Sequence, residues 1–221
     1  MINKVYAVIM AGGSGTRMTM NLGVSKVLMH VNNKTLLEHT IEQLQQSKID
    51  RIFIVCDHPM YDICVKLARI NPFISIYREE KERYESTFLM LYEFLNRNVA
   101  ISNNLLFVYG HAPRHSTYYN SIIDMNTDAD MDIIATQLEK STRRDIIKGS
   151  NGMFIEPPYL IKSELVRKSN SKRWSEFFAD NMGKAVEIGL KSILNEPNEF
   201  NFNNEYLIYM KYIINNYCLV A

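Results

Sequence analysis

The chain has 221 residues, of which 47% are hydrophobic and 22% are charged, the balance of an ordinary globular protein. Its formal net charge of +1 gives no overall field that favours nucleic acid or a membrane surface, and no apolar run approaches the ~20 residues of a membrane span. The three cysteines have no metal-ligand spacing, and their odd number argues against a disulfide framework. We therefore expect a cytoplasmic protein with no nucleic-acid partner and no membrane association.

The first stretch of the chain combines an apolar run with a glycine-rich loop. The run at 5–10 predicts a buried strand, and three glycines follow it within four residues. Glycine lets backbone N–H groups approach an anion closely, because no Cβ intervenes. Arg17 and Lys26 then supply full positive charges, which a plain turn would not need. The loop is neither a Walker A loop nor a dinucleotide fingerprint. The pattern nevertheless favours a site for a nucleoside triphosphate over a simple turn.

The chain alternates helices and strands from this loop to about residue 138. A short apolar strand or extended segment is predicted at 26–31, and Asn32 and Asn33 mark a turn. Thr35 and Glu38 have the spacing of a capping box that opens a helix. Continuous apolar runs predict further strands at 51–56, 73–77, 105–109 and 132–138. Helical patterns predict helices at 36–46, 61–70, 85–96 and 117–125.

This alternation predicts an α/β fold with a mostly parallel central sheet. Strands made of continuous apolar runs, with helices between them, indicate a sheet that is covered on both faces. Ligands of such sheets bind at the carboxyl ends of the strands. The glycine loop lies at one such end, and Gly110 and His111 follow the strand at 105–109 at another. We expect these two segments to share one site.

The last third of the chain is less regular. Glu156 and the two prolines that follow it predict the start of a helix that runs to about residue 167. A closing helix is predicted at 206–217. No linker separates the parts, so we expect a single domain at 1–221. Its nucleotide-binding half would be 1–138, and its acceptor-side half with the closing helix would be 139–221.

Three aromatic residues in this part lie at helical spacing. They are Trp174, Phe177 and Phe178. We favour a stripe that faces the core, because aromatic side chains at this spacing are usually buried. The alternatives are a wall of an acceptor pocket or a dimer surface, and a homodimer stays open.

The opening of the chain resembles the nucleotidyltransferases of the sugar-nucleotide and molybdenum-cofactor type. Their signature is A-G-G-x-G-T-R-M, then P-K, then a helix start of the form K-x-L-L-E-H. Here it stands at 11–18, Ser25-Lys26 and 34–39. The resemblance covers the first forty residues closely, and the order of elements extends it to about Leu138. It implies a Rossmann-like three-layer α/β/α fold and an enzyme of sugar-nucleotide biosynthesis. Such an enzyme moves a nucleoside monophosphate from an NTP to a sugar or alcohol phosphate and releases pyrophosphate.

The resemblance also implies which residues form the site. Arg17 and Lys26 would be catalytic, because they would stabilise charge on the α-phosphate and on the departing pyrophosphate. The residues that would bind the nucleotide are Ala11, Gly12, Gly13, Ser14, Gly15, Thr16, Arg83, Ser86 and His111.

Shorter sequence matches to the family give the nucleotide-binding roles of Arg83 and Ser86 and a metal-binding role for Asn203. Arg83 and Ser86 resemble the R-x-x-S segment that lies over the nucleotide in the methylerythritol-phosphate cytidylyltransferases. The alternative is a helix N-terminus with Ser or Glu as its cap. Asn203 resembles an asparagine that helps to hold Mg²⁺ in several members, and the alternative for it is also a helix N-cap.

The chain departs from the family pattern at the fourth strand. The family usually has Gly-Asp-x-Pro there, and the Asp binds Mg²⁺, whereas this chain has His111 in that position. Mg²⁺ prefers oxygen ligands, and imidazole suits Zn²⁺, Mn²⁺ or no metal. The expected cofactor is Mg²⁺ or Mn²⁺, with His111 as the reason for doubt. His111 as a phosphate ligand is favoured over a metal site with His115, because Pro113 interrupts a helix between them. The alternative function is a catalytically impaired nucleotide-binding module.

Overall fold

The computed structural model describes residues 4–12, 25–69, 71–78, 86–98, 100–101, 103–129, 132–138, 147–149, 152, 154–181 and 184–188. Within these residues the central feature is a seven-stranded sheet in the order β5-β4-β1-β6-β8-β7-β9. Its strands are β1 (Val5–Met10), β4 (Arg51–Cys56), β5 (Ile74–Arg78), β6 (Asn104–Tyr109), β7 (Ile133–Leu138), β8 (Phe154–Lys162) and β9 (Ala185–Ile188). No helix in these ranges is both long enough and apolar enough to span a membrane.

The strand directions confirm a mostly parallel sheet. β1 pairs in parallel with β4 and with β6, β4 with β5, and β7 with β9. Only β8, among the described strands of this sheet, runs antiparallel to its neighbours. The chain leaves β1 toward β4 and β5 and then returns to the other side of β1 as β6. This reversal is the point at which open α/β sheets bind ligands, outside the carboxyl ends of the two strands.

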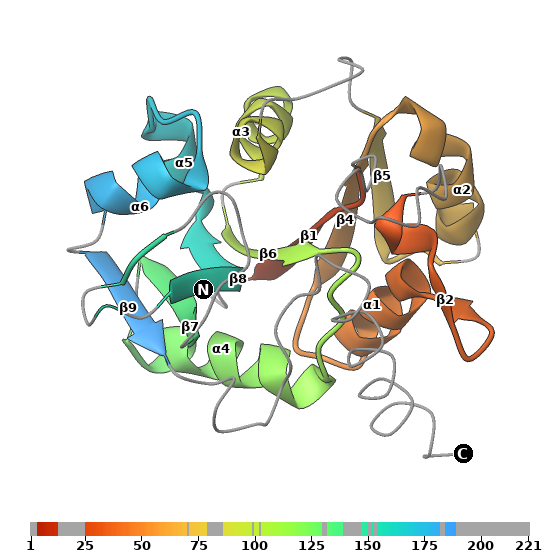
Figure 1. Cartoon of the computed structure of the whole chain (residues 1–221), viewed down its shortest axis with the longest axis horizontal. Coiled ribbons are helices and arrows are strands. Elements are labelled where there is room, and N and C mark those ends of the chain that lie inside the picture. The colour runs from red at the N-terminus through yellow and green to blue at the C-terminus, as the bar shows by residue number, and fades with distance from the viewer. Residues whose placement is uncertain are drawn as a thin grey trace.

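Helices cover both faces of the sheet and make the three predicted layers (Figure 1). One core packs the sheet against α1 (Leu36–Gln45), α2 (His58–Arg69) and α4 (Ser116–Ala129). The other packs it against α3 (Thr87–Arg97), α5 (Ser163–Lys168) and α6 (Trp174–Asn181). The alternation along β1 explains the two cores, because Ala7 and Ile9 face the first and Val8 and Met10 face the second.

Local sequence signals set the boundaries of α1. The backbone N–H of Thr35 donates to Oε2 of Glu38 at 2.7 Å, and the N–H of Glu38 donates to Oγ1 of Thr35 at 3.1 Å. This is the predicted capping box. Asn32 and Asn33 have φ of 51° and 64°, and they form the predicted turn. They join β2 (His30–Val31) to β3 (Lys34–Thr35), a two-stranded hairpin.

The helix predicted from Glu156 to about residue 167 is wrong. Residues 154–162 form β8, and the helix α5 begins only at Ser163. The pairing with β7 passes from Tyr159 directly to Glu156, so Pro157 and Pro158 lie at an irregularity of the ladder. Proline has no N–H to donate, so a break in the pairing is the place where a strand tolerates it. The prolines therefore mark an irregular strand here rather than a helix start.

The aromatic stripe in α6 belongs to the core, as predicted. Trp174, Phe177 and Phe178 are at most 1% exposed. Trp174 packs edge-on against Phe107 of β6, with ring centroids 4.6 Å apart. β8 and β9 also lie in the same sheet as the strands of the first half. The predicted closing helix at 206–217 lies outside the described residues.

Candidate nucleotide-binding site

The described part of the site begins where β1 and β6 end. The backbone N–H of Ala11 donates to the carbonyl of Val55 at 2.9 Å, and that of Gly110 donates to the carbonyl of Met10 at 3.1 Å. Strand pairing therefore continues past the last residues of both strands. As a result, the start of the glycine loop and the segment at Gly110 are held side by side, as their place after parallel strands predicts.

Gly110 lies where β1, α1 and the short 3-10 helix η1 (Lys26–Leu28) converge. A Cβ at this position would lie 3.1 Å from methyl carbons of Ile9 and Val27, and 3.3 Å from Leu37. The hydroxyl of Thr40 shares its hydrogen between the carbonyls of Leu36, at 2.9 Å, and Gly110, at 3.1 Å. Because a Cβ on Gly110 would lie so close to Val27, any side chain larger than hydrogen would push η1 away from the end of β6.

The segment after Gly110 is held by side chains of α1 and α4. The N–H of Ser116 donates to Oε1 of Gln43 at 3.0 Å, and the N–H of Arg114 donates to the hydroxyl of Tyr119 at 3.1 Å. Gln43, Arg114 and Tyr119 are all buried. Buried hydrogen bonds of this kind fix a loop in one conformation. His111 therefore projects from a rigid support.

Lys26 reaches this support from η1. Its side chain is buried, with 8% exposed, and its Nζ lies 3.4 Å from Nε2 of His111. The predicted strand or extended segment at 26–31 is only partly extended, because its first three residues form η1 and only His30 and Val31 form a strand. The turn lets the Lys26 side chain contact a residue 85 positions further along the chain.

The imidazole of His111 also contacts an aromatic ring. It stacks on Tyr109, the last residue of β6, with ring centroids 5.4 Å apart and planes 21° apart. The Tyr109 hydroxyl lies 3.5 Å from Oγ1 of Thr87, which accepts a hydrogen bond from Nε1 of Trp174 at 3.1 Å. The orientation of His111 is thus connected to α3 and α6. Tyr109 is not among the predicted site residues, although its place at the end of a strand is the signal that could have found it.

A carboxylate lies against the start of the glycine loop. A Cβ on Gly12 would lie 3.4 Å from Oδ2 of Asp57, the residue that follows β4. Asp57 is not among the predicted site residues either. Asp57 directly follows β4, the strand next to β1, and this place at the end of a strand could have marked it as a site residue.

Comparison with known proteins agrees with this arrangement. Residues 7–167 match the model of the family described as the MobA-like NTP transferase domain. The chain belongs to this family. The predicted resemblance to nucleotidyltransferases is therefore confirmed.

Curated relatives match shorter stretches. The chain is 45% identical over 53 residues to the bifunctional protein GlmU of Staphylococcus carnosus, which is 24% of this chain and 11% of that protein. It is 40% identical over 92 residues to the bifunctional ribulose 5-phosphate reductase/CDP-ribitol pyrophosphorylase Bcs1 of Haemophilus influenzae, which is 38% of this chain and 18% of that protein. The chain thus matches a small part of each relative's length.

Solved structures show the fold over nearly the whole chain. A nucleotidyl transferase from Methanothermobacter thermautotrophicus is similar with a TM-score of 0.69 at 19% identity, covering 96% of this chain and 99% of that one. The 4-diphosphocytidyl-2C-methyl-D-erythritol synthase of Anaerococcus prevotii is similar with a TM-score of 0.65 at 16% identity, covering 96% of each chain. These likenesses confirm the Rossmann-like nucleotidyltransferase fold.

The MobA-like domain brings together four of its predicted site residues, Ala11, Gly12, Lys26 and His111. Ser86 is the N-cap of α3, where its Oγ accepts from the N–H of Leu89 at 3.2 Å and donates to the carbonyl of Lys172. This is the capping alternative, and a contact of Ser86 with nucleotide stays a prediction. The predicted residues outside the described part are Gly13, Ser14, Gly15, Thr16, Arg17, Arg83 and Asn203.

The imidazole of His111 does not offer the oxygen ligand that Mg²⁺ prefers. Nε2, one of the two imidazole nitrogens that can bind a metal, already contacts the ammonium group of Lys26. A divalent cation there would meet a positive charge and a nitrogen ligand where Mg²⁺ prefers oxygen. His115 contacts Thr117 at the start of α4, and the described ranges contain no group of three or more acidic, His or Cys side chains able to hold a metal. Asn203, the predicted metal ligand, lies outside these ranges, and the cofactor stays a prediction.

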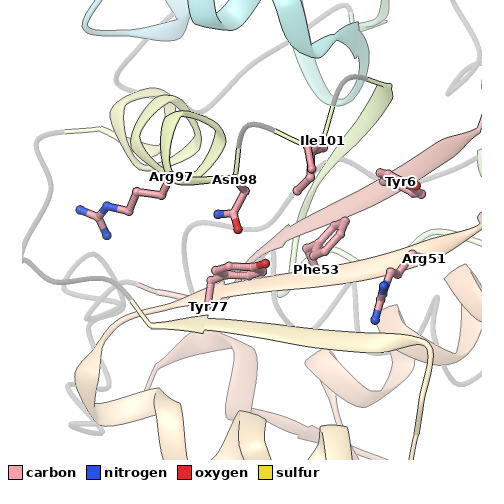
Figure 2. Close-up of a pocket in the computed structure, with 8 residues that line it drawn as sticks. Tyr6, Arg51, Phe53, Tyr77, Arg97, Asn98 and Ile101 are labelled. Carbon is pink, nitrogen blue, oxygen red and sulfur yellow. The ribbon is translucent and has the colours of Figure 1, made fainter.

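A separate pocket of about 410 Å³ lies at the other end of the strands. Tyr6 and Arg51, near the starts of β1 and β4, line it together with Phe53, Tyr77 and Asn98. Figure 2 shows Tyr6, Phe53 and Tyr77 along the sheet and Asn98 directed toward Tyr77. Because Gly12 and Gly110 follow the opposite ends of β1 and β6, this pocket is not part of the nucleotide site.

Proposed function

We propose that this MobA-like domain moves a nucleoside monophosphate from an NTP to a sugar or alcohol phosphate and releases pyrophosphate. The position of Lys26 carries the proposal. Lys26 is a buried residue, and its Nζ contacts His111, which follows β6, the strand beside β1 and the start of the glycine loop. Lysine side chains are mostly exposed, so a buried lysine at this place supports a role in the site. At the switch point of an α/β sheet, the function that fits is binding of an anion.

The chemistry then needs positioning and charge. An oxygen of the acceptor phosphate attacks the α-phosphorus in line, and the bond from that phosphorus to the bridging oxygen of pyrophosphate breaks. Lys26 stabilises the negative charge that builds up on the α-phosphate and on the leaving group. Gly12 lets the backbone approach the phosphates, and Arg17 is the second predicted cation. No covalent nucleophile or general base is required, because the acceptor phosphate is already an anion.

The names of two relatives suggest the first substrates to try. The Haemophilus protein is named for CDP-ribitol, and the Anaerococcus structure for a diphosphocytidyl alcohol. Both names contain a cytidine diphosphate joined to an alcohol. Arg83 and Ser86, the predicted R-x-x-S segment, point the same way. We therefore place CTP with a polyol phosphate first, ahead of other NTPs and of sugar phosphates.

A panel assay tests the proposal. Pyrophosphate release is measured with each of the four NTPs and a set of polyol and sugar phosphates, with and without Mg²⁺ or Mn²⁺, for the wild type and for His111→Asp. Release by the wild type with one pair is the expected result. Nucleotide binding without release from any pair would contradict the proposal and favour the impaired module. Release by His111→Asp alone would support the same alternative, through loss of a metal site.

A further inference from the structure

The pocket at the other end of the strands has the size of a small-molecule site. Its volume of about 410 Å³ lies within the roughly 300–1,000 Å³ that is typical of such sites. Tyr6, Phe53 and Tyr77 line it from three neighbouring strands (Figure 2). The Phe53 ring centroid lies 5.5 Å from that of Tyr6 and 5.9 Å from that of Tyr77. The three rings therefore form an aromatic surface against which a planar ring can pack.

Arg51 brings a positive charge to this surface. Its guanidinium carbon lies 5.9 Å from the centroid of the Phe53 ring. The residue is exposed, and it forms no ion pair with any side chain in the described part of the chain. Arg97, the other arginine of the pocket, donates to the carboxylate of Glu93 at 3.0 Å, which offsets its charge. A guanidinium group matches the two oxygens of an anionic group, so Arg51 is the residue that can bind an anion here.

Asn98 adds a hydrogen-bond acceptor to the pocket. Its Nδ2 donates to the backbone carbonyl of Phe94 at 2.7 Å. A carbonyl can only accept, so this bond fixes which end of the amide is Nδ2 and which is Oδ1. Figure 2 shows the oxygen on the side of Tyr77. Oδ1 therefore faces the pocket, where it can accept from an N–H group of a ligand.

We propose that this pocket binds a small planar aromatic molecule that carries an anionic group and a ring N–H. The ring packs against the aromatic surface, Arg51 binds the anionic group, and Oδ1 of Asn98 accepts from the N–H. The site is separate from the nucleotide site, because Gly12 and Gly110 follow the opposite ends of β1 and β6. Binding here requires neither nucleotide nor turnover.

Calorimetric titration with three probes tests each part of this chemistry. Indole-2-carboxylate has the ring, the N–H and the negative charge. Indole-2-carboxamide has the same ring without the charge, and acetate has the charge without the ring. A carboxylate is used because a phosphate is expected to bind at Lys26. Indole-2-carboxylate should bind at one site, about fivefold more tightly than the carboxamide. Acetate should show no binding at the same concentrations.

Arg51→Gln removes the charge from an exposed position, where the fold does not depend on it. It should lower the affinity for indole-2-carboxylate about fivefold, to that of the carboxamide, and leave the carboxamide unaffected. Arg69→Gln is the matched control, because Arg69 is an exposed arginine of α2, which packs on the opposite face of the sheet. This control should bind both probes as the wild type does. Tyr77→Leu, which removes a ring, should weaken both probes.

Three results would overturn the inference. The first is that the wild type does not bind indole-2-carboxylate at millimolar concentration. The second is that Arg51→Gln binds it as tightly as Arg69→Gln does. The third is that CTP displaces it competitively, since this would place the probe in the nucleotide site.

Discussion

At the scale of single residues, the site depends on how closely η1 packs against the end of β6. Gly110 allows Val27, and with it Lys26, to lie against the end of β6. The glycines of the signature and Lys26 are visible in the sequence because they occur in a compact pattern. The contact of Lys26 with His111 is not visible, because 85 positions separate the two residues and only the sheet brings them together.

Gly110→Ala should disturb this contact. Its Cβ would lie 3.1 Å from Ile9 and Val27, tighter than ordinary van der Waals contact. Overpacking of this kind typically costs about 1–3 kcal/mol, so we expect that loss in urea unfolding, together with weaker nucleotide binding. Gly12→Ala is the matched comparison, because its Cβ would have no neighbour closer than 3.4 Å. A Gly110→Ala protein as stable as Gly12→Ala would contradict the packing argument.

At the scale of elements, the sequence predicts most of the fold because the signals are local. The run at 51–56 coincides with β4, and the capping box places the start of α1. β8 is the failure, because Glu156 and two prolines are typical of a helix start. Its strand pairing with β6 and β7 depends on residues far away in the sequence.

The capping box of α1 gives a test at this scale. α1 carries Thr40 and Gln43, which hold the segment around His111. Thr35→Ala removes the N-cap hydroxyl and should cost about 1 kcal/mol in the free energy of unfolding. Its neighbour Lys34 makes an exposed ion pair with Glu42 at 2.7 Å, so Lys34→Ala should cost only about 0.3 kcal/mol. Equal losses in both variants would show that the box does not stabilise α1.

At the scale of the whole molecule, one sheet contains strands from both predicted halves. β8 lies between β6 and β7, and β9 adjoins β7. The halves at 1–138 and 139–221 are therefore expected to unfold together, because β8 of the second half pairs with both β6 and β7 of the first. The sequence could not show this arrangement, since strand order is set by long-range pairing.

Cooperative unfolding can be followed with two probes. Trp174 is the one tryptophan of the chain, and its fluorescence reports how α6 of the second half packs against Phe88 and Phe107 of the first. Circular dichroism reports the helices and strands of both halves. Coincident urea transitions are expected. A fluorescence transition well separated from the dichroism transition would mean that the halves are independent units.

The central claim is that Lys26 stabilises charge during nucleotidyl transfer. The decisive measurement is the steady-state rate of pyrophosphate release, with the best substrate pair, for the wild type, Lys26→Ala and the control Lys48→Ala. Lys48 is an exposed lysine, 2.6 Å from Asp124 on the surface, and its loss should leave the rate unchanged. For Lys26→Ala we expect kcat to fall about 100-fold or more, with a smaller change in nucleotide affinity. A kcat equal to that of Lys48→Ala would contradict the account.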